Sequence, residues 1–126
     1  MKLACIDVGL KRIGVAICLA SDIVTPQPAI LRKNRNQASV DVNTFLKEWE
    51  IEKLIVGYPS ASEDMQKRIQ HFIKLLELEI PYELQEENMS SIEAEDLIKG
   101  EIKYKRDGRV DSIAAKIILE RFLAKK

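Results

Sequence analysis

The sequence predicts an α/β domain in which helices flank a mixed five-stranded sheet. Two observations support this prediction. The chain begins with three short strand-like segments separated only by turn residues, which is typical of an antiparallel meander. Helical and strand-like segments then alternate, which is typical of parallel strands joined by helical crossovers. A length of 126 residues predicts a single domain spanning residues 1–126.

The expected strands are short apolar runs bounded by turn residues or prolines. They span residues 3–6, 13–19, 23–31, 54–57 and 80–84. The third segment contains Pro26 and Pro28, each of which removes a backbone donor. We therefore expect it to lie at an edge of the sheet or to break before residue 29. The fourth segment is continuously apolar, as in a strand that is covered on both faces.

Apolar residues at helical spacing predict the helices. The first stripe consists of Val42, Phe45, Leu46 and Trp49, preceded by a polar loop over residues 32–37. We expect Trp49 to pack in the core rather than to stack on a base. Ser90 and Glu93 form the pattern of a capping box, which predicts a helix over residues 91–99.

The helix expected after Ser62 combines an apolar face with a basic side. Its apolar residues are Met65, Ile69, Phe72, Ile73 and Leu76. The basic residues are Lys67, Arg68, His71 and Lys74. A basic ridge of this kind either follows a nucleic-acid backbone or is simply solvated, and both interpretations stay open. His71, the single histidine, has no recognisable catalytic setting.

Composition excludes several classes of protein. Charged residues make up 32% of the chain and the formal net charge is zero, which argues against a protein that coats DNA regardless of sequence. Cys5 and Cys18 lack C-x-x-C spacing, so we expect two reduced core thiols. No apolar run approaches the roughly 18 residues of a membrane span, and no signal peptide is evident. We expect a cytoplasmic protein.

The turn after the first strand concentrates chemically useful residues. Asp7 ends an apolar run, where a carboxylate needs a cation, a proton or hydrogen-bond donors. Gly9 and Gly14 permit a close approach by a ligand or another segment. Lys11 and Arg12 place two positive charges near Asp7, which suits a phosphate held beside a metal. From the spacing alone, a solvated hairpin turn explains the same residues equally well.

Three acidic positions are expected at one edge of the sheet. They are Asp7, the pair Glu86 and Glu87 after the fifth strand, and Asp111 at the start of the last helix. Carboxylates without histidine or cysteine suit Mg²⁺ or Mn²⁺, and two such ions can drive phosphodiester hydrolysis. The alternatives are an N-cap role for Asp111 and solvated loop charges at Glu86 and Glu87.

Three motifs resemble those of the YqgF/RuvX family, bacterial nucleases with an RNase H-like fold that were first described as Holliday junction resolvases. Residues 7–16 read D-x-G-x-K-R-I-G-V-A, which is similar to the family's opening signature. Residues 86–91 resemble the acidic motif D-E-R-[LF]-[ST]-T, with Glu87 at the position of its glutamate. Residues 111–115 match the pattern D-x-[IL]-A-A. The resemblance covers nearly the whole chain.

This resemblance implies an RNase H-like, metal-dependent endonuclease that processes the 5′ end of pre-16S ribosomal RNA. Asp7, Glu87 and Asp111 would be catalytic and would bind Mg²⁺ or Mn²⁺. The candidate substrate-binding residues are Lys11 and Arg12 in the turn, with Lys105, Arg106 and Arg109 in a basic loop that we expect over residues 103–109. The alternatives are a Holliday junction resolvase acting on DNA and a non-catalytic nucleic-acid-binding module. An actin-like ATPase shares the D-x-G turn but needs a second such domain.

The chain departs from the acidic motif at two positions. Glu86 stands where the motif has aspartate, and Asn88 stands where it has arginine. Asparagine cannot make the bidentate contact that arginine makes with a phosphate or a carboxylate. The departures leave the three proposed metal ligands in place. They bear instead on substrate affinity and on the order of the acidic loop, and they motivate the non-catalytic alternative.

Overall fold

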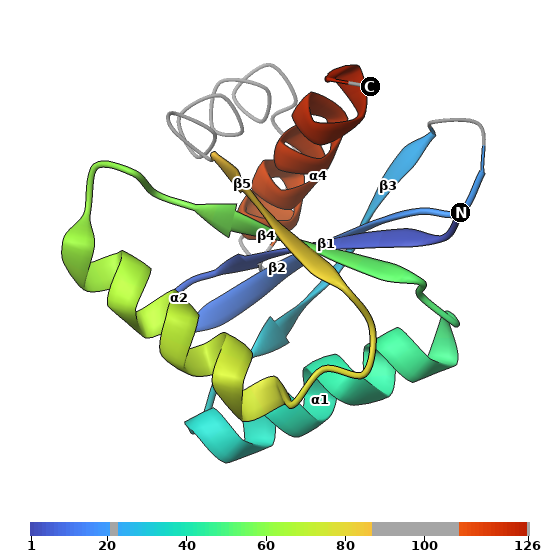
Figure 1. Ribbon diagram of the computed structural model, residues 1–126. Helices are drawn as coiled ribbons and strands as arrows, with labels where there is room; N and C mark the ends of the chain where they lie inside the picture. The colour runs from blue at the N-terminus through green and yellow to red at the C-terminus, as the bar shows by residue number, and fades with distance from the viewer. Residues whose placement is uncertain (21–22, 87–108, 126) are drawn as a thin grey trace.

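The computed structural model describes residues 1–20, 23–86 and 109–125, with the side chains of residues 109–111 left undescribed. The elements in these ranges are β1 (Leu3–Val8), β2 (Arg12–Cys18), β3 (Val24–Leu31), α1 (Arg35–Glu48), β4 (Lys53–Tyr58), α2 (Glu63–Leu76), β5 (Tyr82–Glu86) and α4 (Arg109–Ala124). Figure 1 shows their arrangement. The helix predicted over residues 91–99 and the basic residues Lys105 and Arg106 lie outside the described residues.

The sheet has five strands in the order β3-β2-β1-β4-β5. β1, β2 and β3 form an antiparallel meander, and β4 and β5 run parallel to β1. The predicted mixed sheet is therefore confirmed. It follows that β1, β4 and β5 all end at the same edge of the sheet, next to the turn that joins β1 to β2.

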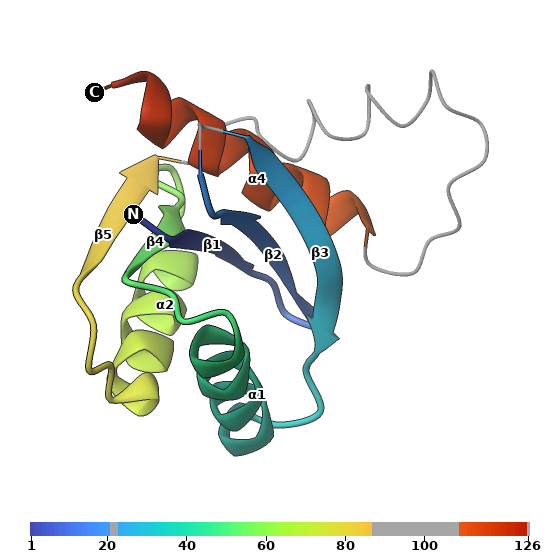
Figure 2. The ribbon, with the colours of Figure 1, turned by 90° about the vertical axis from the view of Figure 1, so that its right-hand side faces the viewer.

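Helices cover both faces of the sheet, with α1 and α2 on one side and α4 on the other (Figure 2). Alternate residues of β1 divide between two apolar cores. Ala4, Ile6 and Val8 belong to the core under α1 and α2, which includes Phe72. Leu3 and Cys5 belong to the core under α4. Asp7 continues this second series and therefore lies on the face that α4 covers.

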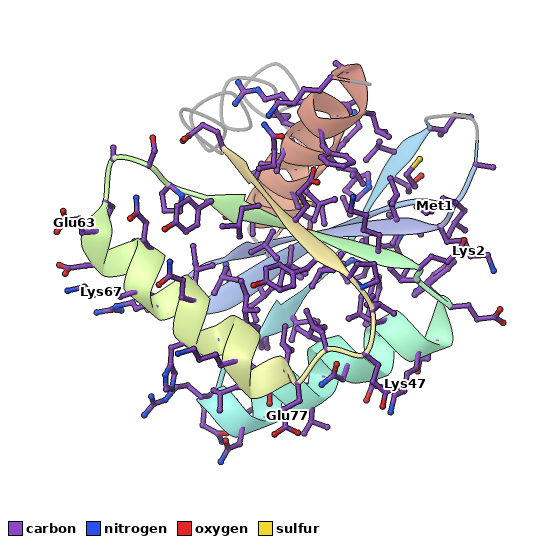
Figure 3. All side chains as sticks on the ribbon, in the orientation of Figure 1. Met1, Lys2, Lys47, Glu63, Lys67 and Glu77 are labelled. Atoms are coloured by element: carbon purple, nitrogen blue, oxygen red, sulfur yellow. The ribbon has the colours of Figure 1, made fainter. Side chains whose placement is uncertain are left out.

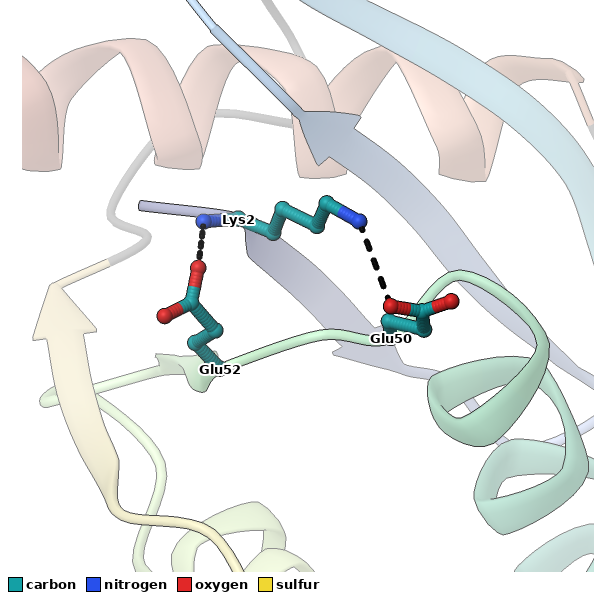
Figure 4. Close-up of polar contacts among 3 residues, drawn as sticks. All are labelled: Lys2, Glu50 and Glu52. Atoms are coloured by element: carbon teal, nitrogen blue, oxygen red, sulfur yellow. Dashed lines mark hydrogen bonds and ion pairs between the residues drawn. The ribbon is translucent and has the colours of Figure 1, made fainter.

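The remaining surfaces of α1 and α2 are charged and solvated. Lys47, Glu63 and Lys67 extend outward from these helices in Figure 3. At the start of β1, the backbone nitrogen of Lys2 donates to Glu52 over 2.8 Å and its ammonium lies 3.6 Å from Glu50 (Figure 4). These contacts fix the start of β1 to the segment between α1 and β4, at the edge opposite the carboxyl ends of the parallel strands.

Several local predictions need correction. β3 is an edge strand, as expected, but it continues unbroken through both prolines, with a register shift against β2 between Ile13 and Val15. α1 begins at Arg35, inside the predicted loop, because the Asn34 and Gln37 side chains form a capping box. The last strand spans Tyr82–Glu86 rather than residues 80–84. Arg109 is the first residue of α4, so it is not a loop residue and Asp111 is not the N-cap.

Other predictions about the core are confirmed. Trp49 is half-buried and packs against the core beside Phe45, with their ring centroids 6.2 Å apart. Cys5 and Cys18 are buried free thiols. None of the helices in the described ranges is long and apolar enough to cross a membrane.

Candidate active site

Asp7 lies near the carboxyl end of β1, between two glycines on the neighbouring strands. Gly14 of β2 is its direct cross-strand partner. On the other side, the last registered pair of β1 and β4 is Ile6 with Val56, so the next position along β4 is Gly57. Neither glycine has a side chain to cover the carboxylate, and Asp7 is accordingly half-buried rather than buried. Glycine at both positions permits a close approach to the carboxylate on the α4 face.

Arg12 lies on the same face of the sheet as Asp7. The pairs Cys5 with Ala16 and Asp7 with Gly14 continue one series, and Arg12 occupies its next position on β2. Diagonal neighbours of this kind are about 7–8 Å apart, which is within reach of a long side chain. The predicted proximity of a cation to Asp7 is thus consistent with the register. Lys11 is exposed at the turn itself.

Gly9 closes the turn in a way that no other residue can. Its backbone nitrogen donates to the carbonyl oxygen of Arg12 over 2.9 Å. A Cβ atom added at Gly9 would lie 2.6 Å from that same oxygen, much closer than van der Waals contact allows. Arg32 supports the turn from outside, since its Nη1 donates to the Gly9 carbonyl over 2.9 Å. The spacing between Asp7 and Arg12 therefore depends on glycine at position 9.

The end of β5 presents Gln85 and Glu86 to opposite faces. Gln85 pairs with Gly57 and therefore shares the face of Asp7, whereas Glu86 pairs with Tyr58 and faces the α2 side. There an oxygen of Glu86 accepts from the backbone nitrogen of Ser60 over 3.3 Å. Glu86 thus lies on the face opposite Asp7. Glu87 lies outside the described residues, and its predicted role stays a prediction.

Gln85 was not among the predicted site residues. It is only 4% exposed, and within the described part of the chain its Oε1 has no hydrogen-bond partner. A buried amide oxygen without a donor is costly unless a cation, a water or a substrate group completes it. The sequence gives little indication of this role, since Gln85 follows the apolar Leu84 and precedes the acidic Glu86 at the end of the strand.

The first turn of α4 is held against the sheet beside Asp7. Ser112, only 1% exposed, accepts a hydrogen bond from the Val15 nitrogen over 3.4 Å and donates to the Gln27 carbonyl over 2.5 Å. These two backbone groups lie at the register shift between β2 and β3. Val15 directly follows Gly14, the partner of Asp7. The backbone of Asp111, which precedes Ser112, is therefore brought close to the Asp7 end of β1.

Two described side chains on this face carry oxygens of the type that a hard divalent cation binds. The described ranges contain no cluster of three histidine, cysteine or acidic side chains, and the side chains of Glu87 and Asp111 are not among those described. The oxygens that the described part supplies are the Asp7 carboxylate and the unpartnered amide oxygen of Gln85. Carboxylate and amide oxygens are ligands that Mg²⁺ and Mn²⁺ accept.

Comparison with known proteins identifies the family of this chain. A family model described as RuvX, Holliday junction resolvase, matches residues 1–125. The chain belongs to the RuvX family. Among RuvX-family relatives, a Sulfurovum sp. protein is 65% identical over 127 residues, covering 98% of this chain and 99% of its own length. A Sulfurimonas denitrificans protein is 50% identical, with 100% and 99% coverage. Both are named as candidate pre-16S rRNA nucleases.

A solved structure shares the fold at low sequence identity. The fowlpox virus resolvase, crystallised with Holliday junction DNA, superposes with a TM-score of 0.61 at 14% identity, covering 99% of this chain and 97% of the viral one. The predicted RNase H-like architecture is confirmed by this likeness. At that identity the likeness concerns the fold and does not extend to the substrate.

Proposed function

We propose that this RuvX-family chain is a metal-dependent endonuclease that hydrolyses a phosphodiester bond at the 5′ end of precursor 16S ribosomal RNA. Family membership and the names of the full-length relatives support the nuclease activity and the RNA substrate. Such a role would place the protein in the cytoplasm, where the precursor is made. The observation that carries the proposal is Asp7, which lies between two glycines at the carboxyl ends of three parallel strands.

The proposed metal ligands are Asp7, Glu87 and Asp111, with Mg²⁺ or Mn²⁺ as the bound ion. When bound, the metal would lower the pKa of a water and neutralise charge on the scissile phosphate. The half-buried position of Asp7 favours binding of a cation, because the attraction between a carboxylate and a positive charge is stronger where the carboxylate is partly desolvated than in bulk water. The absence of side chains at Gly14 and Gly57 would let the sugar-phosphate backbone approach the Asp7 carboxylate.

The remaining roles concern the substrate. The Arg12 guanidinium, on the face of Asp7, would donate two hydrogen bonds to oxygens of the reacting phosphate. Lys11, exposed at the turn, would contact a neighbouring phosphate. Lys105 and Arg106, which precede α4 in the sequence, and Arg109, its first residue, would bind flanking nucleotides. In this arrangement the carboxylates bind the cation and the basic residues bind the RNA backbone.

The test is cleavage of a precursor RNA that carries the 5′ extension, with Mg²⁺, with Mn²⁺ or with EDTA. We expect cutting that requires the metal, and we expect Asp7→Asn to lower the rate at least about 100-fold, since it removes a ligand charge. Asp64→Asn is the matched control, because it makes the same change at an exposed residue of α2. Wild-type cleavage by Asp7→Asn would overturn the proposal.

The alternative substrate is branched DNA. The family description, which names a Holliday junction resolvase, favours it. Parallel reactions with a four-way DNA junction distinguish the two substrates. Faster cutting of the junction than of the precursor RNA would favour the resolvase. Binding of either substrate without cutting under any metal condition would favour the non-catalytic module.

A further inference from the structure

We propose that a hollow on the α1 and α2 side of the β1–β2 turn is a second contact with the substrate, a subsite for backbone phosphates of the RNA. The identity of the ligand as RNA rests on the proposed function. The hollow has a volume of about 430 Å³ and is lined by Leu10, Arg32, Lys33, Asn34, Arg35 and Arg68. We call it the arginine hollow. It brings together the β1–β2 turn, the end of β3, the start of α1 and the middle of α2.

The arginine hollow concentrates positive charge that the described protein does not neutralise. Within the described ranges, no carboxylate forms an ion pair with Arg32, Arg35 or Arg68. Burial lowers the pKa of Arg32 below its usual value, and the neighbouring guanidinium groups of Arg68 and Arg35 lower it further. The surroundings therefore disfavour the charged form of Arg32. An anion in the hollow would reverse this effect, because it would lie close to all three cations.

Two of the three arginines are held in place before any ligand binds. Arg32 donates to the Gly9 carbonyl over 2.9 Å, and its guanidinium lies over the Phe72 ring at 5.5 Å. Arg35 Nη1 donates to His71 Nε2 over 3.1 Å. Each contact uses only part of a guanidinium group, which has five donors. The remaining donors form a preorganised set of the kind that recognises phosphate oxygens.

The start of α1 adds a further positive element. The Asn34 side chain accepts from the backbone nitrogen of Gln37, and the first turn of the helix contains no acidic residue. The helix dipole therefore presents an uncompensated positive end beside the guanidinium groups. The first turn of α2 differs, since Glu63 and Asp64 occupy it. The helix end supports the arginine hollow as an anion site but would not establish one alone.

The structure divides the predicted basic ridge of α2 into two parts. Arg68 lines the arginine hollow, whereas Lys67 extends away from the sheet into solvent (Figure 3). Arg68 is therefore the residue of the ridge that is placed to contact a nucleic-acid backbone, whereas Lys67 is simply solvated. Gly9, whose carbonyl contacts Arg32, lies only two residues after Asp7, or about 7 Å along a strand. An RNA strand with its scissile phosphate at Asp7 can therefore pass around this turn into the hollow.

The experiment measures RNA binding without cleavage. A fluorescent precursor RNA fragment is titrated in EDTA at several salt concentrations with wild type, Arg35→Gln/Arg68→Gln and the solvent-facing control Lys67→Gln. We expect the double variant to lose about tenfold in affinity and to reduce the slope of log K against log salt by roughly 1.4, or about 0.7 per lost contact. The control should bind within about twofold of wild type.

The stability of the variants keeps this test interpretable. Both arginines belong to an unneutralised cluster, so the double variant should melt at or above the wild-type temperature. Equal affinity and equal salt slope for the double variant and Lys67→Gln would overturn the subsite. If that result accompanies loss of cleavage by Asp7→Asn, the subsite fails and the proposed nuclease stands. If Asp7→Asn cleaves normally while the double variant loses binding, the nuclease proposal fails and the subsite stands.

Discussion

Removal of the Ser112 hydroxyl should weaken both the fold and the candidate active site. Ser112 is buried at the start of α4, where its oxygen joins the Val15 nitrogen and the Gln27 carbonyl. Ser112→Ala would leave both backbone groups without this partner. The register between β2 and β3 shifts between Ile13 and Val15, next to these groups, so we expect no backbone group of either strand to replace the hydroxyl.

The expected loss in the free energy of unfolding follows from the two backbone groups that would lose their hydrogen-bond partner. Each lost hydrogen bond costs about 1 kcal/mol, and a fully buried donor left unpaired costs about 1–3 kcal/mol. Val15 is 0% exposed, so its N–H cannot turn to water, whereas Gln27 is half-buried and its carbonyl can be hydrated. The free energy of unfolding should therefore fall by roughly 2–3 kcal/mol. For a domain of this size, that lowers Tm by about 8–12 °C.

The assay is urea unfolding at equilibrium, followed by cleavage of precursor RNA at a temperature where the variant is folded. Ser39→Ala is the matched control, because Ser39 is also buried but its hydroxyl donates only to the Asn36 carbonyl within the same helix. That change should stay within about 0.5 kcal/mol of wild type. Cleavage by Ser112→Ala should fall, since the backbone of Asp111 loses its attachment to the sheet. Equal unfolding midpoints for the two serine variants would show that the Ser112 hydroxyl does not stabilise the fold through these two hydrogen bonds.

Two further changes probe the turn and the end of β5. Gly9→Ala should lower the free energy of unfolding, measured by urea denaturation, by roughly 2–4 kcal/mol, because the added Cβ would lie 2.6 Å from the carbonyl oxygen of Arg12. An unchanged unfolding midpoint would contradict the described turn. Gln85→Leu should leave stability unchanged or raise it by up to about 1 kcal/mol, since the Oε1 atom has no partner among the described residues. The same variant should cleave RNA more slowly, and a loss of more than about 1 kcal/mol without any effect on cleavage would indicate a purely structural role.

The sheet was predictable because its determinants are local. Short turns between the first three strands predict a meander, and helical crossovers predict the parallel strands. The boundaries of the helices and strands were less predictable where polar residues form the end of an element. Asn34 and Gln37 cap α1 although the surrounding residues are typical of a loop. β5 extends to Glu86 because an edge strand can expose polar side chains, and it starts only after Pro81.

The candidate site was predictable only in part. Asp7 and Arg12 lie five residues apart in one motif, and their shared face follows from strand alternation. Gln85 and Ser112 reach the same region through the register between strands and through helix packing, which no local pattern encodes. The arginine hollow likewise depends on bringing Arg32 and Arg68 together from separate elements. Glu87 and the side chain of Asp111 remain predictions from motif resemblance.

Diffraction from crystals soaked in Mn²⁺, with anomalous scattering used to locate the ion, tests whether Asp7, Glu87 and Asp111 share a divalent cation. We expect a manganese peak within coordination distance, about 2.0–2.3 Å, of oxygens from Asp7, Glu87 and Asp111. The peak should vanish in crystals of Asp7→Asn. Manganese bound elsewhere, or a peak of unchanged height after that substitution, would show that these three residues do not form the metal site.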